Sequence, residues 1–171
     1  MTAQSFERVK KVTGSSFEQC KSITTDEFGN VYSVGIFLDT IIFNESLTPV
    51  EFISKNNSSA IFIQKMDENG NLIWAKKIDG NNSEFVSNII VDNNNDLIIV
   101  GLFKDTVDFD PGINETVLIS NNERDIFVLK LSSMGELIWV KNYGSTGLIG
   151  VGNIYIDDSL NIVVSGNFEE I

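Results

Sequence analysis

Carboxylates are the side chains with which this sequence could do chemistry. The 171 residues include 24 Asp and Glu against 12 Lys and Arg, no His and a single Cys. Without His there is no Ser-His-Asp triad, no Cys-His pair and no histidine metal ligand. One Cys cannot form an intrachain disulfide or a Cys-rich zinc site. A pair of carboxylates acting as acid and base, as in glycosidases, is the remaining route to catalysis.

The acidic residues are concentrated in short turns. Asp92-Asn-Asn-Asn-Asp96 has the Asp-x-Asn-x-Asp spacing that begins a calcium loop. The sixth and twelfth positions are Leu97 and Phe103, where an EF-hand needs Gly and Glu. We interpret the segment as a tight turn, which favours Asp and Asn. No acidic cluster interrupts the repeat described below, so we predict no catalytic residue, no metal site and no cofactor.

Composition narrows the classes of partner. The net charge is −12, which argues against sequence-independent binding to nucleic acid. Hydrophobic residues make up 42% and aromatic residues 10%, as in a chain that forms a core. The longest apolar run, Leu97–Phe103, is too short to cross a membrane. The first residues lack the basic and apolar regions of a signal peptide.

The chain repeats itself with a period of 65–66 residues. Residues 26–37 align with residues 92–103 and again with residues 157–168. A second block, residues 61–65 and 70–76, recurs 65 positions later at residues 126–130 and 135–141. The N-terminal residues 9–14 match residues 75–80. Several blocks in register over the whole chain indicate a repeat architecture.

Each unit contains four apolar runs of strand length, which we call a, b, c and d. In the second unit they cover residues 88–91, 97–103, 126–131 and 137–141. They are rich in Ile, Val, Leu and Phe, as strands are. Short turns with Asp, Asn and Gly join a to b and c to d, and a long segment joins b to c. Four antiparallel strands at one period predict an all-β chain of β-propeller blades.

These motifs resemble a known family. The patterns D-x-x-G-N-x-Y-x-x-G-x-F from Asp26, D-I-F-V-x-K-L from Asp125 and G-x-L-x-W-x-K from Gly70 resemble bacterial β-propeller repeats of the SBBP type. Residues 107–112 are similar to the variant common in Bacteroidetes-like proteins. The resemblance implies a propeller in an extracytoplasmic, cell-surface or virion setting, and it implies no catalytic site. The sequence departs from the pattern at Arg8, in place of Trp, and at Ala60, in place of Asp.

The repeat also predicts the organisation of the chain. At 65–66 residues per unit, 171 residues hold about two and a half blades, so the ring is incomplete in this chain. Residues 1–25 would end one blade and begin the next, 26–91 form repeat 1, 92–156 form repeat 2 and 157–171 begin repeat 3. We therefore expect a segment of a larger propeller, or an open stack of blades that another subunit completes.

Strand polarity predicts where a partner would bind. In an antiparallel blade the a–b and c–d turns lie on one face, and the longer b–c and d–a connections lie on the other, which we call the long-loop face. Binding residues are usually carried on loops of a rigid scaffold. The candidate partner residues on this face are Asp39, Phe43, Glu84, Phe85, Asp105, Asp108, Phe109 and Asp110.

Packing is the competing interpretation for part of this set. Phe43 and Phe109 are 66 positions apart, and such recurrence favours packing over recognition. Cys20 falls where Val86 stands in the next unit, so we expect it to be a small core residue rather than a nucleophile.

Two further recurring residue types have structural interpretations. Trp74 and Trp139 lie in strand d and are expected to fill the space between blades. Gly35, Gly101 and Gly166 lie inside strand b, where Gly marks a bulge or the close approach of another backbone.

The function that these observations favour is a non-enzymatic scaffold that contacts a protein partner, or the rest of the same propeller, through the long-loop face. A carbohydrate-binding propeller that contacts a glycan is the alternative. A carboxylate-based hydrolase is the third hypothesis.

Overall fold

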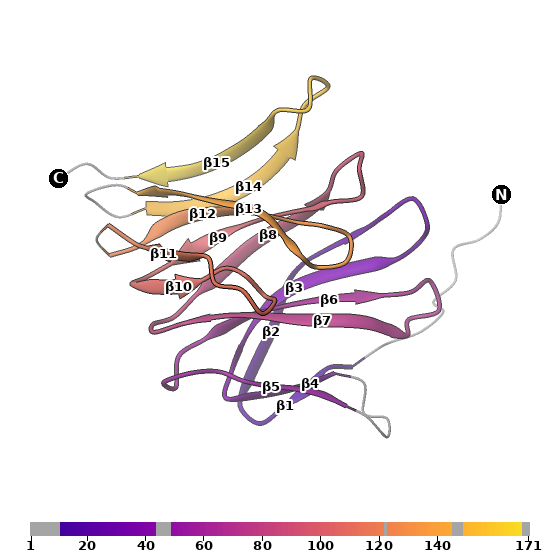
Figure 1. Ribbon diagram of the computed structural model, residues 1–171, viewed down its shortest axis with the longest axis horizontal. Helices are drawn as coiled ribbons and strands as arrows, with labels where there is room; N and C mark the ends of the chain where they lie inside the picture. Colours follow the sequence, from indigo (N-terminus) through magenta and orange to yellow (C-terminus); the bar gives the residue numbers. More distant parts are fainter. Residues whose placement is uncertain (1–10, 44–48, 122, 145–148, 169–171) are drawn as a thin grey trace.

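The protein is built from antiparallel β-sheets that fan out from one side (Figure 1). The computed structural model describes residues 11–43, 49–121, 123–144 and 149–168, and every regular element in them is a strand. Within these ranges there is no helix that could cross a membrane. The predicted all-β class and the predicted antiparallel blades are confirmed.

The first complete blade contains four strands in the predicted order. β2 (Phe17–Thr25), β3 (Val31–Leu38), β6 (Ala60–Met66) and β7 (Leu72–Gly80) pair antiparallel with their neighbours. The inner strands of this sheet, β3 and β6, are almost wholly buried. Both faces of this blade are therefore covered, which explains why β3 and β6 are mostly apolar.

The second blade repeats this arrangement. Its strands are β8 (Phe85–Val91), β9 (Leu97–Phe103), β12 (Asp125–Leu131) and β13 (Leu137–Gly144). The predicted bounds of β9 are correct. β8 begins three residues before the apolar run and β13 extends three residues beyond it. Phe85 and Val86 continue the pairing of β8 with β9, and residues 142–144 continue the pairing of β13 with β12.

A third sheet contains only the first two strands of a unit. β14 (Ile149–Ile156) and β15 (Ile162–Phe168) pair antiparallel and lie at the top of Figure 1. The strands that begin each unit, β2, β8 and β14, adjoin one another. This adjacency is the arrangement expected for successive propeller blades around a common axis.

The long b–c segments fold into hairpins, which the sequence did not predict. β4 (Thr40–Phe43) pairs with β5 (Val50–Ile53), and β10 (Thr106–Asp108) pairs with β11 (Val117–Ile119). β10 also pairs with the end of β7, and β4 pairs with β1 (Thr13–Gly14), which is the equivalent of that end in the preceding unit. Each hairpin is thus attached to the outer strand of the unit before it.

Three apolar clusters hold the sheets together. The largest lies between the first two blades and contains Val34, Ile63, Ile99 and Phe127, all fully buried. A second cluster packs the β4–β5 hairpin on the first blade. The third joins β9 and β12 to β14 and β15. The apolar side chains of these clusters are buried between neighbouring sheets, and this burial is the main contribution to the stability of the fold.

The prediction that Trp74 and Trp139 fill the space between blades is confirmed. The Trp74 Nε1 donates a hydrogen bond to the Ser133 carbonyl, 3.2 Å away in the next blade. Trp139 packs in the cluster that joins the second blade to β14 and β15.

The glycines of strand b lie where a side chain would not fit. A Cβ on Gly35 would be 2.2 Å from the Gln19 carbonyl oxygen and 2.5 Å from the Phe62 ring. A Cβ on Gly101 would be 2.1 Å from the Phe85 carbonyl oxygen and 2.6 Å from the ring of Phe127. The predicted close approach is confirmed, and the opposite strand a has a register shift at the same level.

The register shifts of strand a carry a polar link between blades. The Asn88 Oδ1 accepts hydrogen bonds from the Ile89 amide at 2.8 Å and from the Ser22 Oγ at 2.6 Å. The Asn88 Nδ2 donates to the Asn153 Oδ1, and Asn153 in turn holds the Ile154 amide. The side-chain amide thus replaces a missing ladder bond and joins consecutive blades.

The expectation that Cys20 is a core residue is wrong. Cys20 is exposed, whereas its counterpart Val86 is fully buried against the first blade. Val86 is covered because a complete blade packs on its side of β8. No described blade packs on the corresponding side of β2.

The short turns share one hydrogen-bonding pattern. At Asp26, Asp92 and Asp157 the carboxylate accepts from the backbone amides two and four residues later, at 2.8–3.0 Å. The fourth residue of each turn has a positive φ, which Gly tolerates best. Burial opposes ionisation of Asp26, but hydrogen bonds from Asn30 and Tyr32 outweigh it and lower its pKa.

One turn has an unfavourable residue at that position. Leu160 has φ +64°, where the equivalent turns have Gly29, Gly70, Gly135 or Asn95. Leu160→Gly is therefore expected to stabilise the fold by about 1 kcal/mol, because a leucine pays for the left-handed conformation and its side chain is mostly exposed. Urea unfolding measures the change. Gly29→Ala is the matched variant and should shift the midpoint the other way; equal midpoints for all three chains would contradict this account.

Candidate functional site

The long b–c segments and the d–a connections meet on one face, as the strand polarity predicts. The Glu84 amide donates to the Ser59 carbonyl at 3.0 Å, and the Ser59 Oγ donates to the Glu84 carbonyl at 2.9 Å. These bonds tie the d–a connection to the segment that precedes strand c. The long-loop face is therefore a continuous surface carried by β4–β5, β10–β11 and the β7–β8 connection.

The predicted aromatic residues of this face are inside it. Phe43 and Phe109 are fully buried. The Phe43 ring lies edge-on to Phe62 with centroids 5.7 Å apart, and the Phe109 ring lies 4.9 Å from that of Phe127. Both residues fasten a hairpin to its blade, so neither ring is available to stack on a sugar in this structure. Phe85 is partly buried in the cluster between the blades.

Each hairpin begins with one of the predicted acids. Asp39 and Asp105 have φ +68° and +66°, a conformation that Asp tolerates better than most residues. The backbone amide of each donates to a serine hydroxyl across the hairpin, Ser54 at 2.9 Å and Ser120 at 2.8 Å. Both carboxylates are exposed, although that of Asp39 also accepts from the Ser15 hydroxyl at 2.7 Å. These acids shape the hairpins and leave charge at the surface.

Two further predicted acids, Asp108 and Asp110, hold the loop of the β10–β11 hairpin. The Asp108 Oδ1 accepts from the amides of Asp110 and Thr116 at 3.0 and 2.8 Å. The Asp110 Oδ1 accepts from the Gly112 amide at 2.7 Å. Carboxylates that accept backbone amides in this way stabilise a turn.

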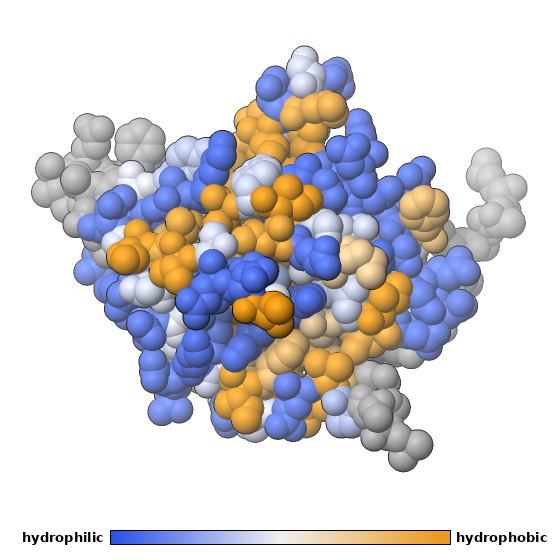
Figure 2. All heavy atoms as spheres, viewed as in Figure 1, coloured by the Kyte–Doolittle hydropathy of each residue, from blue (hydrophilic) through white to orange (hydrophobic). Residues whose placement is uncertain are grey.

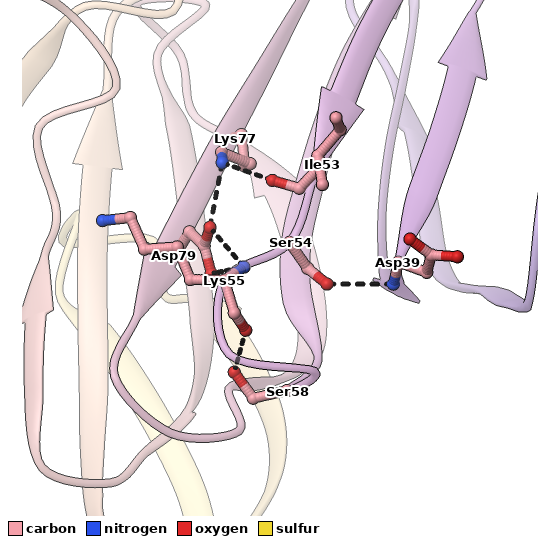
Figure 3. Close-up of polar contacts among 7 residues, drawn as sticks. All are labelled: Asp39, Ile53, Ser54, Lys55, Ser58, Lys77 and Asp79. Atoms are coloured by element: carbon pink, nitrogen blue, oxygen red, sulfur yellow. Dashed lines mark hydrogen bonds and ion pairs between the residues drawn. The ribbon is translucent and has the colours of Figure 1, made fainter.

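A buried carboxylate that the sequence analysis did not identify fastens the first hairpin (Figure 3). Asp79, near the end of β7, accepts from the Lys55 amide at 3.1 Å and from the Lys77 Nζ at 2.9 Å. Lys77 also donates to the Ile53 carbonyl at 2.7 Å. The residues after β5 are thus bound to the outer strand of the blade. The repeat gives no signal for this role, because the equivalent positions are Thr13 and Gly144.

Removing the Asp79 carboxylate should weaken the protein measurably. Asp79→Ala leaves the Lys55 amide without its acceptor and the Lys77 ammonium without its counter-ion, so we expect a loss of about 2 kcal/mol in the free energy of unfolding. Chemical denaturation measures it. Glu123→Ala is the control, because the Lys104–Glu123 pair is exposed and solvent screens it. Equal unfolding midpoints for the two variants would contradict the assignment.

Glu84 is the most unusual group on this face. Its side chain is almost completely buried, and within the described part of the chain neither carboxylate oxygen has a hydrogen-bond partner. Burial raises the pKa of Glu84 to about 8. The Asp79 carboxylate adds to this shift, while the backbone at Gly80 and Glu84 and the Lys55 ammonium oppose it. Near neutral pH the Glu84 carboxyl is therefore protonated, and it packs inside the β7–β8 connection as an uncharged group.

Exposed apolar residues on the hairpins are the second feature that the sequence analysis missed. Ile53 on β5 and Ile119 on β11 are 57% and 63% exposed and occupy equivalent positions, 66 residues apart. Val117 is also exposed on β11, which is the edge strand of its sheet. Figure 2 shows apolar residues gathered over β10 and β11. Exposed apolar side chains at a sheet edge mark a surface that can bind another protein.

The described residues do not group their acids as metal ligands. Within the described ranges there is no cluster of three or more His, Cys, Asp or Glu residues that could hold a metal ion. The calcium-like segment is a tight turn, as interpreted from the sequence. Its Asp92 and Asp96 carboxylates lie 2.7 and 3.1 Å from the Lys130 Nζ, which forms an ion pair with each.

Comparisons with known proteins agree with a repeat of the propeller type. No protein-family model matches the chain, so the narrower SBBP assignment has no support from that comparison. The chain is 26% identical over 112 residues to an uncharacterized WD repeat-containing protein, L264, of Acanthamoeba polyphaga mimivirus. The match covers 64% of this chain but 8% of that protein. This distant likeness, together with the blades described above, supports a β-propeller-type repeat.

Proposed function

We propose that this chain is a non-enzymatic propeller segment that binds a protein partner through the long-loop face. The observation that carries the proposal is the pair of equivalent hairpins that present Ile53, Val117 and Ile119 to solvent from a rigid sheet. Buried contacts at Asp79, Phe43 and Phe109 hold these hairpins in place. A preorganised apolar surface loses little conformational entropy on binding, which favours association.

The predicted acidic residues have a supporting part in this proposal. Asp39, Asp108 and Asp110 hold the hairpins, and the exposed Asp105 adds negative charge beside the apolar residues. We infer a partner surface with apolar contacts and a basic rim, since charge complementarity assists encounter and orientation. The motifs quoted above also favour SBBP-type repeats as the origin of these blades, and the WD repeat-containing relative favours an interaction role.

Serine substitution on each face provides the test. One variant carries Ile53→Ser, Val117→Ser and Ile119→Ser on the hairpins. The matched control carries Phe28→Ser, Met134→Ser and Leu160→Ser, three exposed apolar residues of the short turns. Proteins of the source cell captured on each immobilised chain are quantified by mass spectrometry. We expect the hairpin variant to lose the specific partner and the control to retain it; the opposite result would place binding on the short-turn face and overturn the proposal.

A further inference from the structure

The second edge of β15 is open within the described part of the chain. β3 and β9, its equivalents in the complete blades, each pair on both edges, whereas β15 pairs with β14 alone. Figure 1 shows β15 along the upper boundary of the molecule. A groove of about 600 Å³ opens beside it. The second blade contributes Ile126, Val128 and Trp139 to its walls, and β15 contributes Ile162, Val164 and Gly166.

Gly166 leaves a space that an aromatic ring occupies in the complete blades. The equivalent Gly35 and Gly101 lie beneath the rings of Phe62 and Phe127, which belong to the adjacent strand c. Among the described residues, the three atoms nearest to a Cβ on Gly166 would be backbone atoms of Gly150 and Val151, and none of them belongs to a ring. Gly166 therefore leaves room for a phenyl ring like those that cover Gly35 and Gly101.

The rest of the groove fits the same strand type. In the second blade, Phe127 lies opposite Gly101, Leu129 opposite Ile99 and Leu131 opposite Leu97, and all three β12 side chains are fully buried. The equivalent positions on β15 are Gly166, Val164 and Ile162, and all three line the groove. Because side chains alternate along a strand, one added strand would place its third, fifth and seventh residues in this groove.

Charge at the a–b turn is complementary to such a strand. Lys130 of β12 lies opposite Ile98 and binds Asp92 and Asp96. Asp157 stands at the place of Asp92, and within the described residues it has no lysine partner. In the first blade the equivalent Lys65 turns instead to the Ser133 carbonyl, above the Tyr32 ring. The third unit has Val163 at the Tyr32 position, so it resembles the second blade in leaving the route to the aspartate open.

We propose that the open edge of β15 binds a polypeptide strand of the β12 type by strand addition. Its residues are counted here as in β12, with the equivalent of Asp125 as the first. The third residue is aromatic and covers Gly166, the fifth and seventh residues are apolar, and the sixth residue is a lysine that pairs with Asp157. Main-chain hydrogen bonds to an open edge provide affinity, and alternate side chains provide specificity. This surface is separate from the hairpins of the long-loop face, so the inference does not depend on the function proposed there.

A peptide with the sequence of residues 124–132, Arg-Asp-Ile-Phe-Val-Leu-Lys-Leu-Ser, is the probe. Its binding to the whole chain is followed by calorimetry and by the fluorescence of Trp139, which lines the groove. We expect saturable binding that weakens about tenfold when alanine replaces the phenylalanine. A scrambled peptide is the control and should not bind. Equal affinities of the native, scrambled and alanine peptides would overturn the proposal.

A charge cycle tests the lysine contact separately. Asp157→Asn retains the acceptor oxygen that holds the turn but removes the charge. This variant should bind the lysine peptide several-fold less tightly and should bind a lysine-to-methionine peptide as the unsubstituted chain does. The serine variant of the hairpins should leave peptide binding unchanged. A stable dimer that the peptide fails to disperse, measured by analytical ultracentrifugation, would identify a second copy as the occupant and overturn the assignment.

Discussion

Glu84→Gln is expected to make the protein more stable at alkaline pH and to change its stability little near pH 5. Burial raises the pKa of Glu84 from its ordinary 4.5 to about 8. The folded state therefore holds a proton that the unfolded state releases between these two values. An acid whose pKa is raised by folding stabilises the protein fully below its pKa in the unfolded state. This stabilisation is lost as the pH rises through its pKa in the folded state.

The expected effect is large for a single substitution. The advantage of the glutamine variant should widen by about 4 kcal/mol between pH 5 and pH 9, since each unit of pKa difference corresponds to about 1.4 kcal/mol. That change is a sizeable share of the stability of an ordinary domain. Urea unfolding of both chains at several pH values measures it directly.

A matched exposed acid separates burial from net charge. Glu51→Gln removes a charge from the exposed side of β5 and should give a stability curve parallel to that of the unsubstituted chain. If the Glu84 and Glu51 variants showed the same pH dependence, the carboxyl of Glu84 would be ionised in the folded protein. The account of a neutral, buried carboxyl would then be wrong.

Phe109→Ala is expected to cost about 3–5 kcal/mol of stability, the usual range when a buried phenylalanine is truncated. Phe109 is fully buried, and its ring centroid lies 5.2 Å from Phe103 and 4.9 Å from Phe127. The residue also joins the loop of the β10–β11 hairpin to the blade, because its amide donates to the Thr116 carbonyl at 3.0 Å. Loss of the ring should therefore loosen the hairpin as well as the core.

The control for this prediction is a phenylalanine on the surface. Phe28 lies in the first a–b turn and is 67% exposed, so Phe28→Ala should leave the unfolding midpoint almost unchanged. Thermal and urea unfolding of both variants provide the comparison. A Phe109 variant that unfolds like the unsubstituted chain but fails to bind its partner would show that Phe109 acts in recognition instead of packing.

The architecture of the blades could be predicted from the sequence because it depends on local patterns that recur. The turn residues Asp26, Asp92 and Asp157 and the strand glycines each have one physical purpose, and that purpose repeats every 65–66 residues. A repeat of four apolar runs leaves few alternatives to stacked antiparallel sheets.

The roles of individual acids and of Cys20 were harder to predict, since they depend on what packs against each residue. Asp79 lies near the end of β7 and Asp105 lies shortly after β9, yet Asp79 is buried under the hairpin and Asp105 is exposed. Cys20 and Val86 share a position in the repeat and differ in burial because only one of them faces a neighbouring complete blade. The hairpins were missed because β10 and β11 have three residues each, too few for a periodic signal.

The attachment of β10 to β7 means that the folding unit is out of phase with the sequence repeat. A cut between residues 91 and 92, at the boundary of the repeats, would leave the first blade without the strand that covers the end of β7. Neighbouring units must therefore fold together, and their interfaces contribute to cooperativity as they do in other repeat proteins. Fragments designed for expression should end after β11, so that each blade retains the hairpin that its successor provides.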